Sequence, residues 1–127
     1  MTVLTACIIQ SVAAKAADFT VNSTLDAVDA NPGDGICQTA SGDCTLRAAI
    51  GEANQLAGLD WIILPAGTYT ITMAGAEEDA NATGDLDVTD HLVLTGASSV
   101  ATLIDGGNLD RVLHVDPGAN GISVAVS

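Results

Sequence analysis

Alternation of apolar and polar residues dominates the second half of the chain and predicts short β-strands. Ile62 and Leu64 precede a Pro-Ala-Gly turn, and Tyr69, Ile71 and Met73 then alternate with threonines. A two-residue period is the mark of a half-buried strand. Further apolar groups, separated by Gly- or Pro-containing turns, extend the pattern: Val88, Leu92 and Leu94; residues 102–104; Leu113 and Val115; Ile122, Val124 and Val126.

The period changes to 3.6 over residues 45–57, which predicts one amphipathic helix. Its apolar face comprises Leu46, Ala49, Ile50, Ala53, Leu56 and Ala57. Thr45 is a suitable N-cap and Gly58 a suitable C′ residue. Before the helix, residues 19–22 predict a short strand, and residues 26–43 predict a loop because turn-forming residues crowd it.

The strands follow one another without intervening helices, so a sheet built from βαβ units is not expected. A sandwich and a solenoid remain, and the pattern favours an all-β solenoid. Residues 62–64, 92–94 and 112–115 resemble successive rungs of one face, and few segments have the two-residue loops of tight hairpins. The helix would then cap the first coil and cover its open strand edges.

Composition and charge narrow the range of partners. The 127 residues contain three Lys and Arg against sixteen Asp and Glu, a formal charge of −13. Such a charge excludes nucleic acid and other polyanions as expected partners. No stretch approaches the ~20 apolar residues that a membrane-spanning helix needs. Aromatic residues make up only 2% of the chain, so we expect an aliphatic core.

The first sixteen residues resemble a secretion signal. They contain no acid, are largely apolar and end in Ala14-Lys15-Ala16, a small-x-small pattern that predicts cleavage before Ala17. A basic segment is missing at the start, which indicates that the natural leader is longer. The alternative is that these residues form an apolar first strand.

Two cysteines, Cys37 and Cys44, remain after this cleavage. An even pair in a Gly- and Asp-rich loop of an exported protein predicts a disulfide. Closure of so short a loop stabilises by roughly 2–3 kcal/mol in the chain-entropy view. Free thiols and a metal site are the alternatives, although a Cys-His zinc set would lack nearby histidines.

Three segments together resemble the CSLREA domain, which opens secreted or surface-anchored bacterial proteins. They are residues 19–24 (FTVNST), 29–37 (DANPGDGIC) and 44–50 (CTLRAAI), the last followed by Glu52-Ala53-Asn54. Residues 64–69 and 103–106 resemble the coils that follow it. The chain departs from the family at Ala48, where the family has the Glu of a capping box.

The resemblance implies a right-handed parallel β-helix with one N-terminal capping α-helix. In this interpretation residues 1–16 are a truncated signal peptide, residues 17–58 form the cap, and residues 59–127 form the first coils. The last strand stops in mid-pattern, so we expect the chain to continue beyond Ser127.

No catalytic constellation is found. β-Helix lyases are similar to one another in using Lys or Arg as a base, and only Arg47 and Arg111 remain after processing. Hydrolases of this kind use clustered Asp residues. The remaining candidates are more simply turn-forming or surface residues: Asp85, Asp87, Asp90, His91 and His114.

Calcium is the sharper cofactor hypothesis. Five hard oxygen ligands lie within eighteen residues of the loop: Asp26, Asp29, Asn31, Asp34 and Asp43. Their spacing does not match an EF-hand, since Gly33 and Asp34 occupy positions where Asp and then Gly are required. The same residues also make ordinary turns, which is the alternative explanation.

The sequence therefore predicts a non-catalytic, exported structural or adhesin-like segment, secreted or held on a bacterial cell surface. Its partner would be an extracellular glycan or protein. One alternative is the N-terminal part of a polysaccharide lyase or glycoside hydrolase whose catalytic coils lie beyond residue 127. Another is a small calcium-binding module.

Overall fold

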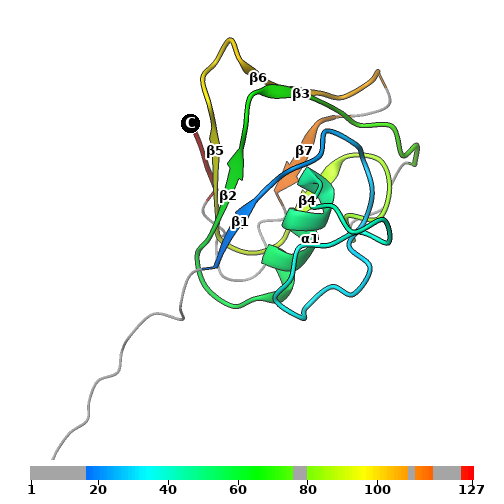
Figure 1. Cartoon of the computed structure of the whole chain (residues 1–127), viewed down its shortest axis with the longest axis vertical. Helices are drawn as coiled ribbons and strands as arrows, with labels where there is room; N and C mark the ends of the chain where they lie inside the picture. Colours follow the sequence, from blue (N-terminus) through cyan, green and yellow to red (C-terminus); the bar gives the residue numbers. More distant parts are fainter. Residues whose placement is uncertain (1–16, 76–79, 109–110, 116–123) are drawn as a thin grey trace, which may run out of the picture.

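A computed structural model describes residues 17–75, 80–108, 111–115 and 124–127. In this part of the chain there are one helix and eight short strands (Figure 1). In chain order they are β1 (Asp18–Thr20), α1 (Leu46–Gln55), β2 (Asp60–Leu64), β3 (Gly67–Thr70), β4 (Leu86–Val88), β5 (Leu92–Gly96), β6 (Thr102–Asp105), β7 (Leu113–Val115) and β8 (Val124–Val126). Each predicted apolar segment therefore contains or adjoins a strand.

All strand pairs between these elements are parallel. The largest sheet has the order β1-β2-β5-β8, and two further sheets pair β3 with β6 and β4 with β7. In the four-stranded sheet Ile62 lies beside Phe19 on one side and Leu94 on the other. These three side chains are buried on the same face, which explains why apolar residues alternate with polar ones in each strand.

The expected right-handed parallel β-helix is wrong. The strands lie in separate small sheets of four, two and two strands, and no closed solenoid is present among the described residues. Residues 112–115 do not join the sheet of residues 62–64 and 92–94, because β7 pairs with β4. Alternation requires only that one face of each strand be buried, and small sheets around a shared core meet that requirement equally well. The chain is a small mixed α/β domain.

The helix is part of this core. α1 packs against β2 and β4 (Figure 1). Its residues Ala49 and Ile50 are completely buried. The remaining core is aliphatic with two aromatic rings, as the composition predicts. It comprises Phe19, Val21, Cys44, Leu46, Ala53, Ile62, Leu64, Tyr69, Ile71, Leu86, Val88, Leu92 and Leu94.

The start of the helix is confirmed and its end differs slightly. The hydroxyl of Thr45 accepts a hydrogen bond from the N–H of Ala48 at 3.1 Å, as an N-cap should. The helix ends at Gln55, and the N–H of Leu56 closes the last turn on the carbonyls of Glu52 and Ala53. Gly58 has the positive φ of a C-terminal glycine, at 110°, but lies one residue beyond the C′ position.

Two expectations fall on residues outside the described part. The proposed signal peptide occupies residues 1–16, and part of the last predicted strand lies within residues 116–123. Within the described residues, no helix has the length and apolar character needed to cross a bilayer.

Candidate functional site

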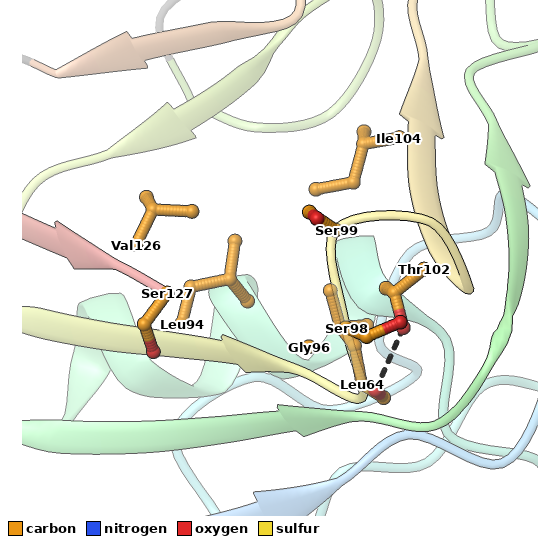
Figure 2. A pocket seen from close by; sticks show the side chains of 9 residues that line it. All are labelled: Leu64, Leu94, Gly96, Ser98, Ser99, Thr102, Ile104, Val126 and Ser127. Atoms are coloured by element: carbon orange, nitrogen blue, oxygen red, sulfur yellow. Dashed lines mark hydrogen bonds between the residues drawn. The ribbon is translucent and has the colours of Figure 1, made fainter.

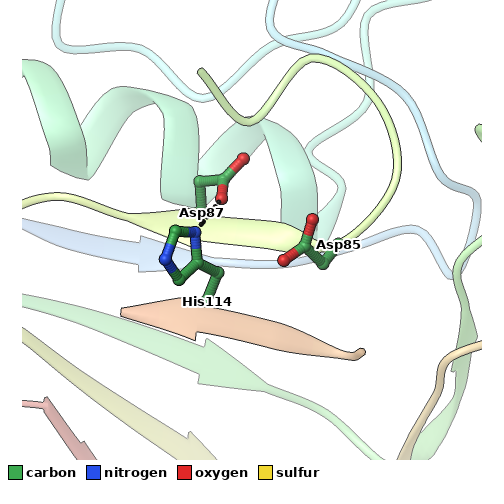
Figure 3. A group of neighbouring side chains, drawn as sticks. All are labelled: Asp85, Asp87 and His114. Carbon is green, nitrogen blue, oxygen red and sulfur yellow. Dashed lines mark hydrogen bonds and ion pairs between the residues drawn. The ribbon is translucent and has the colours of Figure 1, made fainter. Parts of the chain in front are cut away.

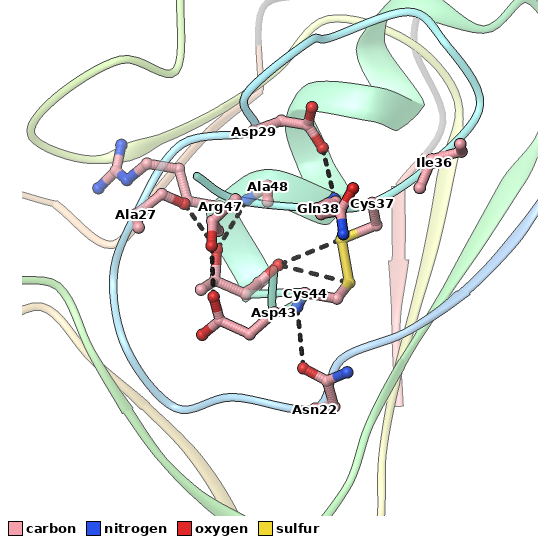
Figure 4. The surroundings of a disulfide bond; sticks show 12 residues. Asn22, Ala27, Asp29, Ile36, Cys37, Gln38, Asp43, Cys44, Arg47 and Ala48 are labelled. Atoms are coloured by element: carbon pink, nitrogen blue, oxygen red, sulfur yellow. Dashed lines mark hydrogen bonds between the residues drawn. A yellow bond between two sulfur atoms is a disulfide. The ribbon is translucent and has the colours of Figure 1, made fainter. Parts of the chain in front are cut away.

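A disulfide joins Cys37 to Cys44 and closes the loop that precedes α1 (Figure 4). Two hydrogen bonds hold the chain on the Cys44 side of the bridge. The N–H of Cys44 donates to the side-chain oxygen of Asn22 at 2.8 Å, and the hydroxyl of Thr45 donates to the carbonyl of Ala27 at 2.6 Å. The predicted pairing is confirmed, and it fixes the entry of the chain into α1.

Arg47 is the centre of a buried polar network. Its guanidinium binds both carboxylate oxygens of Asp26, at 2.6 and 3.2 Å, and its side chain has no exposed surface. It also donates to three backbone carbonyls, those of Gly84 at 2.6 Å and of Asn81 and Asp85 at 3.3 Å. The planar fork of arginine suits this two-sided role. One side chain thereby connects the loop, the helix and the segment that leads into β4.

Asp26 is held ionised by this network. Burial alone would raise its pKa, but hydrogen bonds from Arg47 and from the N–H groups of Met73 and Thr72 outweigh burial and lower the pKa. A carboxylate with four such donors stabilises the loop as an internal cross-link. Asp26 is therefore already committed to protein donors.

Three other acids converge where the loop crosses the helix. Ligand oxygens of Asp29, Asp34 and Glu52 all lie within 4.8 Å of one another, so this cluster has the composition of a cation site. Glu52 is fully buried and accepts from the N–H groups of Gly33 at 2.8 Å and Gly35 at 3.0 Å. Burial is the largest cause that raises the pKa of Glu52. The two hydrogen bonds lower the pKa in part, and the negative charges of Asp29 and Asp34 raise it further.

The five residues predicted to bind calcium therefore separate in space. Asp29 and Asp34 belong to the cluster with Glu52, and the amide of Asn31 donates to Asp34. Asp26 is bound to Arg47, and Asp43 accepts from the hydroxyl of Thr39. The sequence pattern missed Glu52 because it lies on α1. What marks Glu52 as a site residue is that this polar side chain is buried on the helix, and only the folded structure shows that burial.

A second acidic group lies between β4 and β7 (Figure 3). Ligand atoms of Asp85, Asp87 and His114 lie within 4.8 Å of one another, and Figure 3 shows the His114 ring facing Asp87. Nδ1 of His114 lies 2.9 Å from Oδ1 of Asp87, while Arg111 is paired with Asp85. The parallel register sets Asp87 beside His114. His114 thus has an acidic neighbour on β4.

An apolar hollow of about 300 Å³ lies between the carboxyl ends of β2 and β5 and the strands β6 and β8 (Figure 2). Leu64, Leu94, Ile104 and Val126 supply its apolar walls, and Gly96 with three serines and Thr102 supply the rest. Among the described residues that line it, none carries a carboxylate, imidazole, amine or thiol.

The outer face of the four-stranded sheet carries an unusual exposed tryptophan. Trp61 is the only tryptophan in the chain, and 44% of its surface is exposed. It lies beside Asp18 of β1 and Val93 of β5, while Ile63, 37% exposed, lies beside Thr20 and Thr95. These six side chains define what we call the Trp61 face: Asp18, Thr20, Trp61, Ile63, Val93 and Thr95.

No protein-family model, curated protein or solved structure matches this chain. Its function is therefore argued from the geometry of the described residues.

Proposed function

We propose that this chain is an exported, non-catalytic structural unit that binds a neutral glycan through the Trp61 face. The observation that carries the proposal is the exposure of the only tryptophan in the middle of a solvent-facing sheet. The disulfide is consistent with an oxidising compartment outside the cytoplasm.

The proposal of a non-catalytic role rests on how the charged side chains of the described residues are used. Asp26 is bound by Arg47, Asp85 by Arg111, and Glu52 by two backbone N–H groups. Each acid is thus an acceptor in an internal contact. A catalytic acid or base has to reach a substrate proton from a cleft, and the apolar hollow contains no such group.

The Trp61 face has the chemistry of a sugar-binding surface. A tryptophan ring offers a flat apolar surface and one N–H donor, which suits the apolar face and hydroxyl groups of a pyranose ring. Asp18 and Thr20 lie on the adjacent strand and add polar groups beside the ring. A net charge of −13 disfavours acidic polysaccharides, so we propose a neutral glycan.

The test uses Trp61 itself as the probe, because no other tryptophan contributes to the fluorescence. Titration of the full chain with neutral hexasaccharides of glucose and of N-acetylglucosamine should shift the emission, whereas heparin should not. By calorimetry, Trp61→Ala should weaken binding at least tenfold. The control Leu103→Ala removes another exposed apolar side chain, 51% exposed on β6, and should bind normally. No response to either neutral sugar, or a preference for heparin, would refute the proposal.

A second function, structural calcium binding, is favoured by the cluster of Asp29, Asp34 and Glu52. Calcium takes six to eight oxygen ligands, and a cation would offset the mutual repulsion of these acids. Added calcium should raise the melting temperature of the wild type, and a chelator should reverse this increase. Glu52→Gln should abolish the calcium response, while Asp43→Asn, outside the cluster, should retain it. An unchanged melting temperature in calcium would exclude the site.

A further inference from the structure

Asp60 is a buried acid with only half of its carboxylate satisfied. It is the first residue of β2, and its side chain points to the core side of the sheet with no exposed surface. Its Oδ1 accepts a hydrogen bond from the backbone nitrogen of Ala17 at 2.9 Å. Among the described residues, its Oδ2 is the one buried side-chain nitrogen or oxygen without a hydrogen-bond partner.

The surroundings of Asp60 are negative. The neighbouring charges that act on the Asp60 carboxylate are those of Asp90, which precedes β5, and Asp18 on β1. His91 contributes its backbone carbonyl, which accepts a hydrogen bond from the N–H of Asp60 at 3.2 Å. Burial, and then these two acids, raise the pKa of Asp60. Ionised carboxylates are buried at high cost unless they are paired. Within the described part of the chain, an ionised Asp60 carboxylate therefore lacks a positive partner, and its Oδ2 lacks a hydrogen-bond donor.

The backbone nitrogen of Ala17 is the atom best placed to supply both. As part of a peptide bond it offers a single N–H and no charge. As a chain terminus it would be an ammonium with three donors and a full positive charge. Its carbonyl is already fixed, because it accepts from the N–H of Trp61 at 2.8 Å. The nitrogen is therefore held against Asp60 by the pairing of β1 with β2.

The sequence independently marks the same atom. Ala14-Lys15-Ala16 places small residues three and one positions before Ala17, the arrangement that signal-peptidase-like enzymes select. We propose that such an endopeptidase hydrolyses the Ala16–Ala17 peptide bond and that the released α-ammonium of Ala17 forms a buried ion pair with Asp60. Water adds hydroxyl to the Ala16 carbonyl and a hydrogen to the Ala17 nitrogen, and the amine takes a further proton from solvent.

This ion pair couples processing to stability. Cleavage converts one neutral hydrogen bond into a charged contact that also reaches Oδ2, and it locks β1 onto β2. The inference rests on the export part of the proposed function, since it requires a processing enzyme, but the contact itself does not depend on glycan binding. A neutral terminus, or a terminus one residue longer, would leave Asp60 in its unpaired state.

The sequence offers a clean chemical control. Lys15 is the only lysine, so the processed chain contains one primary amine, the α-amine of Ala17. Acetylation of the processed protein therefore blocks this group alone and restores a peptide-like N–H. We expect the free-amine form to have about a tenfold larger folding equilibrium constant than the acetylated form near pH 6, which corresponds to an α-amine pKa raised by about one unit.

The carboxylate is tested with matched variants. Asp60→Asn should remove the difference between the free and acetylated forms, whereas Asp90→Asn, which leaves the contact intact, should retain it. If Asp60→Asn does not fold, titration of the Ala17 amine by NMR decides the question. Its pKa should lie above the usual range of about 7.7–8.0. Equal stability of the two forms, or a normal amine pKa, would overturn the ion pair.

The cleavage is tested by mass spectrometry of the chain exported from a bacterial host that expresses residues 1–127 behind a basic leader segment. The product should begin at Ala17. Cleavage at another bond, or an uncut chain, would overturn the processing step. Glycan titration of the same product reports on the proposed function separately, so failure of one does not obscure the other.

Discussion

Replacement of Arg47 by methionine is the sharpest test of the buried network. Methionine has similar length and no charge, so the variant removes the two bonds to Asp26 and the three bonds to backbone carbonyls without opening a large cavity. The carboxylate of Asp26, only 5% exposed, is left without its cation. Breaking a buried pair in this way costs about 3–5 kcal/mol.

This loss is a large part of the roughly 5–15 kcal/mol that stabilises a domain of this size. With a urea m value of about 2 kcal/mol per M, the midpoint of unfolding should fall by roughly 1.5–2.5 M. Arg47→Lys keeps the charge but loses the fork, so its loss should be smaller. Gln55→Ala, an exposed position of the same helix, should change the midpoint little.

The pH dependence separates loss of the ion pair from loss of packing. In the wild type the lowered pKa of Asp26 gives stability that is present above its unfolded pKa and lost as the pH falls through the folded pKa. In Arg47→Met the unpaired carboxylate is disfavoured, so protonation relieves the variant. The gap between wild type and variant should therefore narrow from pH 7 to pH 4. A loss below about 1 kcal/mol, or a gap that does not change with pH, would refute this reasoning.

Three further outcomes are expected. Cys37→Ser with Cys44→Ser should lower the free energy of unfolding by about 2.5 kcal/mol, measured in urea, because the closed loop is short. The stability of the wild type relative to Glu52→Gln should increase as the pH falls from 7 towards 4, because the raised pKa of Glu52 means that its charged form destabilises the fold. A difference in unfolding free energy that does not change with pH would contradict this. Gly84→Ala should cost about 2 kcal/mol or more by thermal melting, because φ is 68° and an added Cβ would lie 2.4 Å from a carbonyl oxygen. Gly35→Ala, at φ 84° with open space around it, should cost less.

Local features of the fold were accessible from the sequence. The 3.6 period and Thr45 located the start of α1, and the alternation at Ile62 and Leu64 located β2. These predictions succeed because helix caps and one-sided burial are encoded by residues close in the chain. The pairing of Cys37 with Cys44 was predicted for the same reason.

The arrangement of these elements was not accessible. Alternation at Leu113 and Val115 shows that one side of β7 faces the interior, but it does not show that β7 pairs with β4. The closed solenoid was inferred from repeated spacing, and spacing does not determine which sheet a strand joins. The helix also joins the core because its small residues allow close packing against β2 and β4.

The site residues divide in the same way. Asp29 and Asp34 were recognised as possible ligands because they lie close together in sequence. Glu52 was missed because the contact that brings it to Gly33 spans nineteen residues. The role of Arg47 was also missed, since its partners at Asp26 and Gly84 lie 21 and 37 residues away. Such contacts depend on tertiary folding and leave no periodic signal.

Thiol trapping of residues 1–127, expressed in a bacterial host behind a basic leader segment, tests the central proposal of an exported, disulfide-closed unit most directly. Cells are fractionated, free thiols are blocked with a maleimide, and the mass of the peptide that contains Cys37 and Cys44 is measured in each fraction. We predict that the chain is recovered outside the cytoplasm with both cysteines unlabelled and joined. Recovery in the cytoplasm with both cysteines labelled would contradict the proposal.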